Sequence, residues 1–433
     1  MKKLSATQIA VALATTHYGL GFLIGTGQDM AEYGAAGMLY AFSTALGLLT
    51  LVPIANYYWR RRVPIWDIFA KQHGAAAGKF TAFLSSFWMV GVIASQILGG
   101  SAALMAFGVS RVVSTTIIAG LILLLSYLNL SRLSKVFFQF LLISSIVVLF
   151  SLLMYSNVSA LVTTPIVFIT SLPSLPFDKL FGILLTTIFI TFIGMDFHQF
   201  IVKAADPKTA RHGAVGGFLI LTALTSILGS SILGFQASEQ PTPESPLSSA
   251  QVVPRMLMST GTNLLGEWSA LVFLVPIILV SAGSGSAVTK VVIKAAEEIQ
   301  PAVRNVKAFN LIVIGACVLL TLLSQSIVGL VVSFYATYVG TVLAAFIAVR
   351  LEEKRLISIS NQAFYLALLV GFGFSLIVFL ISKLSFIIIT DASLHMLIAG
   401  FLGATAIFVK SALSNRVVNV GDIRPTKRYK GAR

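Results

Sequence analysis

Charged residues are scarce in this sequence. Asp, Glu, Lys and Arg together make up 10% of its 433 residues, whereas soluble domains carry roughly 25%. Hydrophobic residues make up 57%, and apolar runs of about twenty residues, each long enough to cross a bilayer core, recur from end to end. No polar stretch between them is long enough for a soluble domain. The composition therefore excludes a soluble globular protein and indicates a single all-α polytopic membrane domain over 1–433.

Cysteines and catalytic motifs are also lacking. Cys317 is the single cysteine and lies in an apolar run, so no disulfide framework can form. The sequence contains no His-Glu-x-x-His, Gly-x-Ser-x-Gly or phosphate-loop pattern. We therefore expect neither an enzyme nor an ATP-driven pump, and we expect no cofactor.

The apolar runs predict about twelve transmembrane helices. They are expected near 5–32, 34–58, 77–107, 112–129, 134–155, 179–203, 213–236, 267–290, 308–326, 328–349, 360–382 and 391–410.

The basic residues alternate between the connections. With the N-terminus in the cytoplasm, all of the 30 lysines and arginines fall on the cytoplasmic side except Arg111, Lys179, Arg255 and Lys383. Such a bias predicts cytoplasmic N- and C-termini in a plasma (inner) membrane. We expect the net charge of +15 to fix topology and meet anionic lipid of the bilayer, with no nucleic-acid partner. The polar stretch 237–246 is expected to be external.

The first and sixth predicted helices are interrupted in a similar way. The first contains an Ile24-Gly25 pair followed by Thr26-Gly-Gln-Asp29, which has the Thr-x-x-Asp spacing of a helix N-cap. The sixth contains an Ile193-Gly194 pair, followed by Asp196 and Gln199 at the same spacing. Matched interruptions in two inverted halves indicate a binding site at the membrane midplane. Glycines that only permit close helix packing are the alternative explanation.

The distance between these interruptions equals about five helices with their connections, so the chain divides into two inverted five-helix repeats. We expect the first repeat over 5–155 and the second over 178–350. Two additional helices are expected over 358–410, followed by a basic cytoplasmic tail over 411–433.

Four segments carry a likeness to a known family. They are Phe22-Leu-Ile-Gly25 with Glu32-Tyr-Gly34, Ile65-Trp-Asp-Ile-Phe-Ala-Lys-Gln-His-Gly74, Gln96-Ile-Leu-Gly-Gly100 and Gln199-Phe-Ile-Val-Lys-Ala-Ala-Asp-Pro-Lys-Thr-Ala-Arg211.

Through these segments the chain resembles the sodium:solute symporter family of the APC superfamily, whose members have the leucine-transporter-type five-plus-five fold. The chain differs in lacking the extra N-terminal helix of many members and in having Phe200 where the family has arginine. The resemblance implies cation-coupled symport of a small polar organic solute, such as an amino acid, sugar or carboxylate, by alternating access. The alternative is a membrane sensor module on the same fold with an unlinked signalling partner.

Polar groups within apolar spans are costly and usually face a cavity or a partner. On this basis, and from the two interruptions, we expect the solute to contact Gly21, Phe22, Gly25, Thr26, Gln96, Gly194, Asp196 and Gln199. Trp88 is expected to be a packing residue.

The resemblance also implies a sodium site between the broken first helix and the eighth helix. Its expected ligands are the carbonyls of Thr15 and Tyr18 and the hydroxyls of Ser281 and Ser284. One hydroxyl of the family's pair is replaced by Ala282. A free imidazole titrates near neutral pH, so proton coupling through His17 or Asp196 is the alternative to sodium.

Overall fold

The structure is a computed structural model that describes residues 3–128, 130–239, 249–299, 306–383 and 391–421. The long elements in these ranges are all helices. The apolar runs form helices because a backbone in lipid must satisfy its hydrogen bonds within the segment.

The first part of the chain forms α1 (Ala6–His17), a π-helical turn η1 (Gly21–Gly25), α2 (Thr26–Tyr33), a 3₁₀ turn η2 (Gly34–Met38), α3 (Leu39–Arg61), α4 (Ile65–His73), α5 (Ala75–Met105), α6 (Arg111–Ser126), α7 (Leu130–Tyr155), α8 (Val158–Ser171) and η3 (Leu172–Ser174). The second part forms α9 (Phe177–Ile193), α10 (Met195–Val202), α11 (Pro207–Glu239), α13 (Val252–Leu265), α14 (Ser269–Ile299), α15 (Val306–Leu323), α16 (Ile327–Glu353), α17 (Asn361–Lys383) and α18 (Ala392–Gly421).

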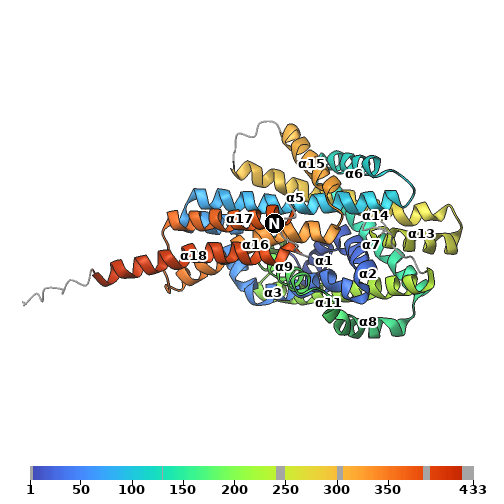
Figure 1. The fold of residues 1–433 in the computed structure, drawn as a ribbon, viewed down its shortest axis with the longest axis horizontal. Coiled ribbons are helices and arrows are strands. Elements are labelled where there is room, and N and C mark those ends of the chain that lie inside the picture. The colour runs from blue at the N-terminus through green and yellow to red at the C-terminus, as the bar shows by residue number, and fades with distance from the viewer. Residues whose placement is uncertain (1–2, 129, 240–248, 300–305, 384–390, 422–433) are drawn as a thin grey trace, which may run out of the picture.

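The long helices run along the long axis of the molecule, and α18 projects beyond the body (Figure 1). In the bundle, α5 packs against α14 and α16, while α11 packs against α1 and α3. Helix α17 packs mainly against α18. The broken segments α1, η1, α9 and α10 are thereby enclosed by long, continuous helices.

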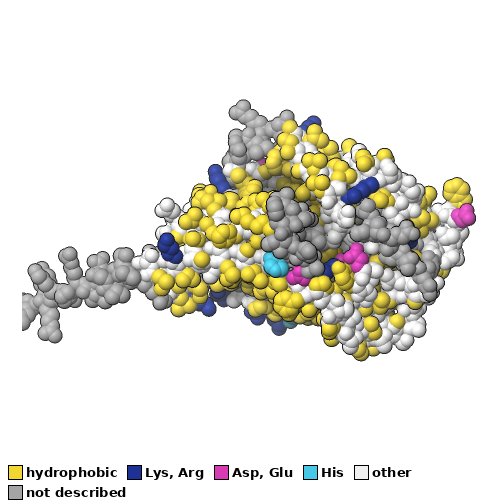
Figure 2. All heavy atoms as spheres, viewed as in Figure 1, with side chains coloured by type: hydrophobic (Ala, Val, Ile, Leu, Met, Phe, Trp, Pro, Cys, Tyr) yellow, Lys and Arg dark blue, Asp and Glu magenta, His cyan; other side chains and the backbone are white. Residues whose placement is uncertain are grey.

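The outer surface of the bundle is suited to lipid. Within the described residues, seven helical stretches are long and apolar enough to cross a membrane, and up to nine if each of two bent pairs counts as one span. Two shorter apolar helices cover 111–126 and 307–323. Hydrophobic side chains cover much of the face in Figure 2, and large ones such as Leu153 and Ile312 are exposed. The chain is an integral membrane protein with multiple spans.

A helix or a broken helix lies at each of the twelve predicted positions. Three further helices in the described part of the chain were not predicted. Helix α4 is short, α13 follows the polar stretch, and α8 has only 14 residues, fewer than the roughly twenty that a perpendicular span needs. The α7 segment Leu142–Tyr155 bends by 94° into the following segment Ser159–Ser174.

The first helix is broken earlier than the sequence suggested. Helix α1 ends at His17, and the chain resumes as the π-helical turn η1, which runs into α2 with Gly25 and Thr26 both in right-handed helical conformation. Thr26 Oγ1 is buried and has no hydrogen-bond partner among the described residues, so the predicted N-cap is wrong. Because η1 continues directly into α2, Thr26 lies within a continuous helical turn and does not cap a separate helix.

The sixth helix is broken at the predicted glycine. Helices α9 and α10 meet at an angle of 40°, and Gly194 between them is extended, with ψ 130°. The second break therefore lies at the predicted glycine, whereas the first lies closer to the N-terminus than the predicted Ile24-Gly25 pair.

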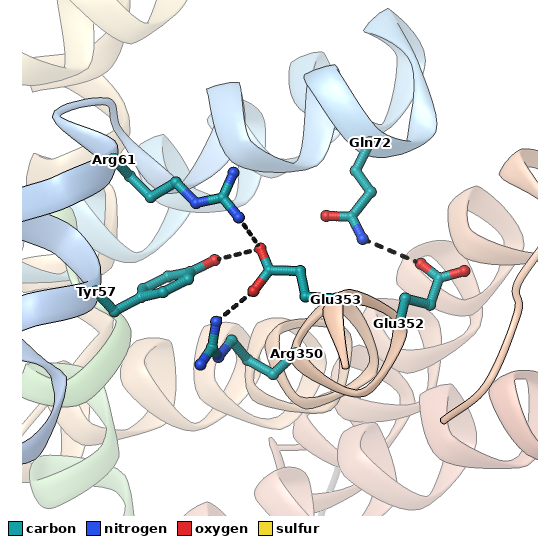
Figure 3. Close-up of polar contacts among 6 residues, drawn as sticks. All are labelled: Tyr57, Arg61, Gln72, Arg350, Glu352 and Glu353. Carbon is teal, nitrogen blue, oxygen red and sulfur yellow. Dashed lines mark hydrogen bonds and ion pairs between the residues drawn. The ribbon is translucent and has the colours of Figure 1, made fainter. Parts of the chain in front are cut away.

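Segments from the first and second parts of the chain meet at one end of the bundle. The Leu4 amide donates to the Lys203 carbonyl (2.9 Å), and Trp59 Nε1 donates to the Ala204 carbonyl (3.1 Å). At the same end, Glu353 of α16 pairs with Arg61 of α3 and with Arg350 (Figure 3). We call this the N-terminal end.

Two expectations concern residues outside the described ranges. Most of the polar stretch 237–246 lies in 240–248, and the last part of the tail lies in 422–433. The boundaries of the two repeats stay a prediction.

Candidate functional site

A cavity of about 260 Å³ lies where the two broken helices meet. Residues of α1, η1, α3, α5, α10, α14 and α16 line it. They are Thr15, Thr16, His17, Gly19, Gly21, Phe22, Tyr40, Trp88, Met89, Val92, Ser95, Gln96, Asp196, Phe197, Gln199, Phe200, Ser284, Ala287, Val288, Val291, Val331 and Tyr335.

Gln96 of α5 holds the break in the first helix. Its Oε1 accepts a hydrogen bond from the Leu20 amide (3.1 Å), which has no α-helical partner because α1 has already ended. A Cβ at Gly19 would lie 2.6 Å from Gln96 Nε2. The glycine therefore allows the amide side chain to approach the unwound backbone.

Asp196 lies in the first turn of α10 and carries a buried carboxylate oxygen. Its Oδ1 is buried and has no hydrogen-bond partner among the described residues. A Cβ at Gly194 would lie 2.9 Å from this oxygen, so the glycine makes room for it. Gln199 does not satisfy the carboxylate, because its Nε2 donates to the Asp196 main-chain carbonyl (2.9 Å).

His17 lies at the end of α1, beside the first break, and contacts α10, which follows the second break. Its ring stacks on Phe197 of α10, with ring centroids 4.3 Å apart and planes at 13°. His17 Nε2 is buried and has no hydrogen-bond partner within the described part of the chain. The cavity wall therefore carries two titratable side chains, His17 and Asp196, each with an unsatisfied buried polar atom.

The expected ion ligands are divided between two places. Thr15 and Ser284 line the cavity, whereas Tyr18 and Ser281 are absent from its lining. The Ser281 hydroxyl donates to the Gln96 carbonyl (2.7 Å) and so joins α14 to α5. Tyr18 packs on Phe22, with ring centroids 5.3 Å apart. The ion-binding role of these four residues stays a prediction.

The expected solute contacts are also divided. Gly21, Phe22, Gln96, Asp196 and Gln199 line the cavity, but Gly25, Thr26 and Gly194 do not. Gly25 faces Val328 and Ile327 of α16, where a Cβ would lie 2.9 Å from a methyl of Val328.

Sequence reasoning did not assign the aromatic wall to the site. Trp88, which we expected to pack, lines the cavity together with Tyr40, Phe197, Phe200 and Tyr335. The one available signal was the spacing of Trp88 and Gln96 on α5, which places both on neighbouring parts of one face.

The end of the bundle opposite the N-terminal end is closed by polar contacts. Lys179 Nζ of α9 lies 3.1 Å from Asp29 Oδ1 of α2 and 3.9 Å from the centre of the Tyr33 ring. Gln28 Nε2 donates to the Gln325 carbonyl (2.7 Å), and Gln28 Oε1 accepts from the Ile327 amide (3.0 Å). In the other direction, the cavity includes the exposed side chain of Thr16.

This arrangement is the fold of leucine-transporter-type secondary transporters, with broken first and sixth helices around a central cavity. The chain is similar in structure to a Na⁺-coupled sialic acid symporter in a substrate-bound outward-open state. That match has a TM-score of 0.68 at 11% identity and covers 95% of this chain and 90% of the symporter.

It is also similar to Mhp1 in an inward-facing conformation, with a TM-score of 0.61 at 12% identity, covering 96% of this chain and 92% of Mhp1. Mhp1, a nucleobase-cation-symport-1 family transporter, in a closed conformation with bromovinylhydantoin bound matches with a TM-score of 0.55 at 11% identity, over 97% of this chain and 94% of that one. The predicted fold is thereby confirmed. No family model matches the sequence, and no curated protein matches it by sequence.

Proposed function

We propose that this protein is a cation-coupled secondary transporter of a small polar organic solute and works by alternating access. The observation that carries this proposal is the cavity of about 260 Å³ at the meeting point of two broken helices. Breaks of this kind expose backbone groups and helix ends to a solute and an ion at the membrane midplane. The volume lies just below the roughly 300–1,000 Å³ of drug-sized ligand sites, so the solute is small.

We further propose that both termini face the cytoplasm and that the described conformation is inward-facing. The basic residues Lys3, Arg60, Arg62 and Lys203 belong to the segments that meet at the N-terminal end, in agreement with a positive-inside orientation. The cavity includes the exposed Thr16, whereas the Lys179–Asp29 pair lies on the opposite side of the breaks. The second side would have to open for solute to enter from outside.

Within the cavity, we propose that the solute contacts Gly21, Phe22, Gln96, Asp196 and Gln199. The coupling ion is proposed to bind near Thr15 and Ser284, with sodium as the first candidate. Sodium needs several oxygen ligands, and two of the four expected residues lie away from the cavity wall. Protonation of His17 or Asp196 is therefore the second candidate.

A ligand panel tests the proposal. Purified protein is heated with amino acids, sugars, carboxylates, amines or nucleobases, with or without sodium, because a ligand that binds the native state raises the melting temperature. Solutes that stabilise the protein are then tested for uptake into proteoliposomes. We expect Asp196→Asn to impair uptake more than Asp29→Asn, since only Asp196 lines the cavity. Stabilisation without any uptake would favour the sensor alternative.

A further inference from the structure

The described residues of the cavity lining include an acidic side chain but no lysine or arginine. Asp196 is the one carboxylate among them. A carboxylate in a low-dielectric site is costly unless a counter-charge or hydrogen-bond donors compensate it. Asp196 Oδ1 has no hydrogen-bond partner within the described chain, although the main-chain amides of Asp196 and Phe197 lie close to the carboxyl group. The neighbouring amide of Gln199 is bonded to the main chain. The cavity thus contains one carboxylate oxygen that has no hydrogen-bond donor among the described residues.

The backbone at the first break offers little to an anionic group. The Leu20 amide already donates to Gln96 Oε1 (3.1 Å), and the Gly19 amide donates to the His17 carbonyl (2.7 Å). A solute carboxylate would therefore meet neither a lysine or arginine side chain nor these two amides. It would instead add a second negative charge near Asp196.

The rest of the wall suits an organic cation. Phe22, Tyr40, Trp88, Phe197 and Tyr335 line the same cavity as Asp196. Aromatic faces attract ammonium groups, and the attraction is stronger where water is excluded. Such faces also shield the methyl or methylene groups around a charged nitrogen from water.

We propose that the transported solute is a small organic monocation, a protonated amine or a quaternary ammonium ion, whose charged nitrogen lies against Asp196 among the aromatic side chains of the cavity lining. This inference rests on the proposed transport function and assigns its substrate class. It excludes anionic solutes and zwitterions that keep a free carboxylate.

The test compares solutes of matched shape and different charge on the full-length protein. Choline carries the positive charge, glycine betaine adds a carboxylate, and 3,3-dimethylbutan-1-ol is the neutral carbon analogue of choline. Ethanolamine and dimethylaminoethanol extend the set to protonated amines. Binding is measured by thermal shift and calorimetry, and transport by uptake into proteoliposomes. We expect at least one cation to bind and be transported, and betaine and the neutral alcohol to bind at least about thirtyfold more weakly, as loss of a buried charge pair predicts.

Substitution of the carboxylate gives the second readout. Asp196→Asn should weaken cation binding by about thirtyfold or more and remove the preference for choline over its neutral analogue. Glu297→Gln, a matched change at an exposed residue of α14 that is outside the cavity lining, should change neither. If Asp196→Asn does not fold, the ranking of the matched solutes on the unaltered protein still decides.

Two results would overturn the inference. If a neutral or anionic solute of the wider panel is transported while every cation fails, the substrate class is wrong and the transport function stands. If no solute of any class binds or is taken up, the proposed function fails, and the inference fails with it.

Discussion

Lys179 Nζ lies 3.1 Å from Asp29 Oδ1, and this pair joins the two broken helices on the side of the breaks opposite the N-terminal end. The two side chains are only 14% and 3% exposed, so little water screens them. Separating a buried pair leaves an uncompensated charge in a poorly solvated place. The pair therefore stabilises the closed form of this side, and its release would accompany opening.

Loss of the pair should shift the protein toward outward-facing states. In a Cys317→Ser background, Thr26→Cys serves as a reporter because Thr26 is fully buried in the described conformation. We expect Lys179→Met to raise its rate of labelling by a membrane-impermeant maleimide by about tenfold, well within the free energy of a broken buried pair. Lys203→Met, at an exposed residue of the N-terminal end, is the control. Equal labelling in the two variants would show that the pair does not close this side.

A second prediction concerns His73 of α4, a helix outside the membrane-crossing stretches. Its ring stacks on Phe364 of α17 (3.8 Å between centroids), and its Nε2 lies 2.8 Å from Glu352 Oε2. Burial lowers the pKa of His73 from 6.5 to about 4. Because the unfolded chain binds the proton at higher pH, the stabilisation by neutral His73 is complete above about pH 6.5 and is lost as the pH falls toward 4.

The direction in which this stabilisation changes with pH distinguishes a neutral His73 from a charged His73 that pairs with Glu352. The melting temperature of His73→Gln should lie below that of the unaltered protein at pH 7.5, and the difference should narrow by pH 5. His212→Gln, at an exposed histidine, should show a small and constant difference. A difference for His73→Gln that widens at low pH would mean that a charged His73 pairs with Glu352, contrary to the expectation.

A third prediction tests the tight turn after α2. A Cβ at Gly37 would lie 2.2 Å from the Met30 main-chain nitrogen, which cannot move aside as a flexible side chain could. We expect Gly37→Ala to lower the free energy of unfolding by about 1–3 kcal/mol, as overpacking does. Gly315→Ala should be neutral or slightly stabilising, because a Cβ at Gly315 would meet no other atom within 4 Å and alanine favours helix. A mild effect of Gly37→Ala in denaturant unfolding would mean that η2 rearranges easily.

The sequence predicted the helices and the two breaks because both depend on local composition. Apolar runs specify spans, and Gly194 interrupts one of them where no other signal competes. The N-cap at Thr26 was wrong because a π-helical turn has no signature in residue spacing. Helix α8 was missed because it is too short to cross a bilayer perpendicularly.

The sequence predicted only part of the site, because only residue types that are rare in apolar spans stand out. Asp196, His17 and Gln96 stand out because polar groups are rare in apolar spans. Tyr335 and Trp88 do not stand out, since aromatic residues on a membrane helix pack against neighbours as often as they line a cavity. The partner of Ser281 depends on how α14 meets α5, which is a tertiary contact that one sequence does not reveal.

A fourth prediction concerns the coupling ion. If sodium is coupled near Thr15 and Ser284, Ser284→Ala should weaken the sodium dependence of uptake about tenfold or more, since few other oxygens are available, and His17→Asn should leave it intact. If a proton is coupled through His17, His17→Asn should abolish the response to an imposed pH gradient, while Ser284→Ala should not. Ser281→Ala should also weaken the sodium dependence of uptake if Ser281 is a ligand. It should leave that dependence intact if Ser281 only joins α14 to α5.

Concentrative uptake is the most direct test of the transport mechanism. Proteoliposomes containing the purified protein receive an inward sodium gradient, an inward proton gradient or neither, and a radiolabelled solute that stabilises the protein is supplied at equal concentration on both sides. The account predicts accumulation above the external concentration under at least one gradient, and none under that gradient with Asp196→Asn. Failure of the unaltered protein to accumulate any stabilising solute under either gradient would contradict cation-coupled transport through this cavity.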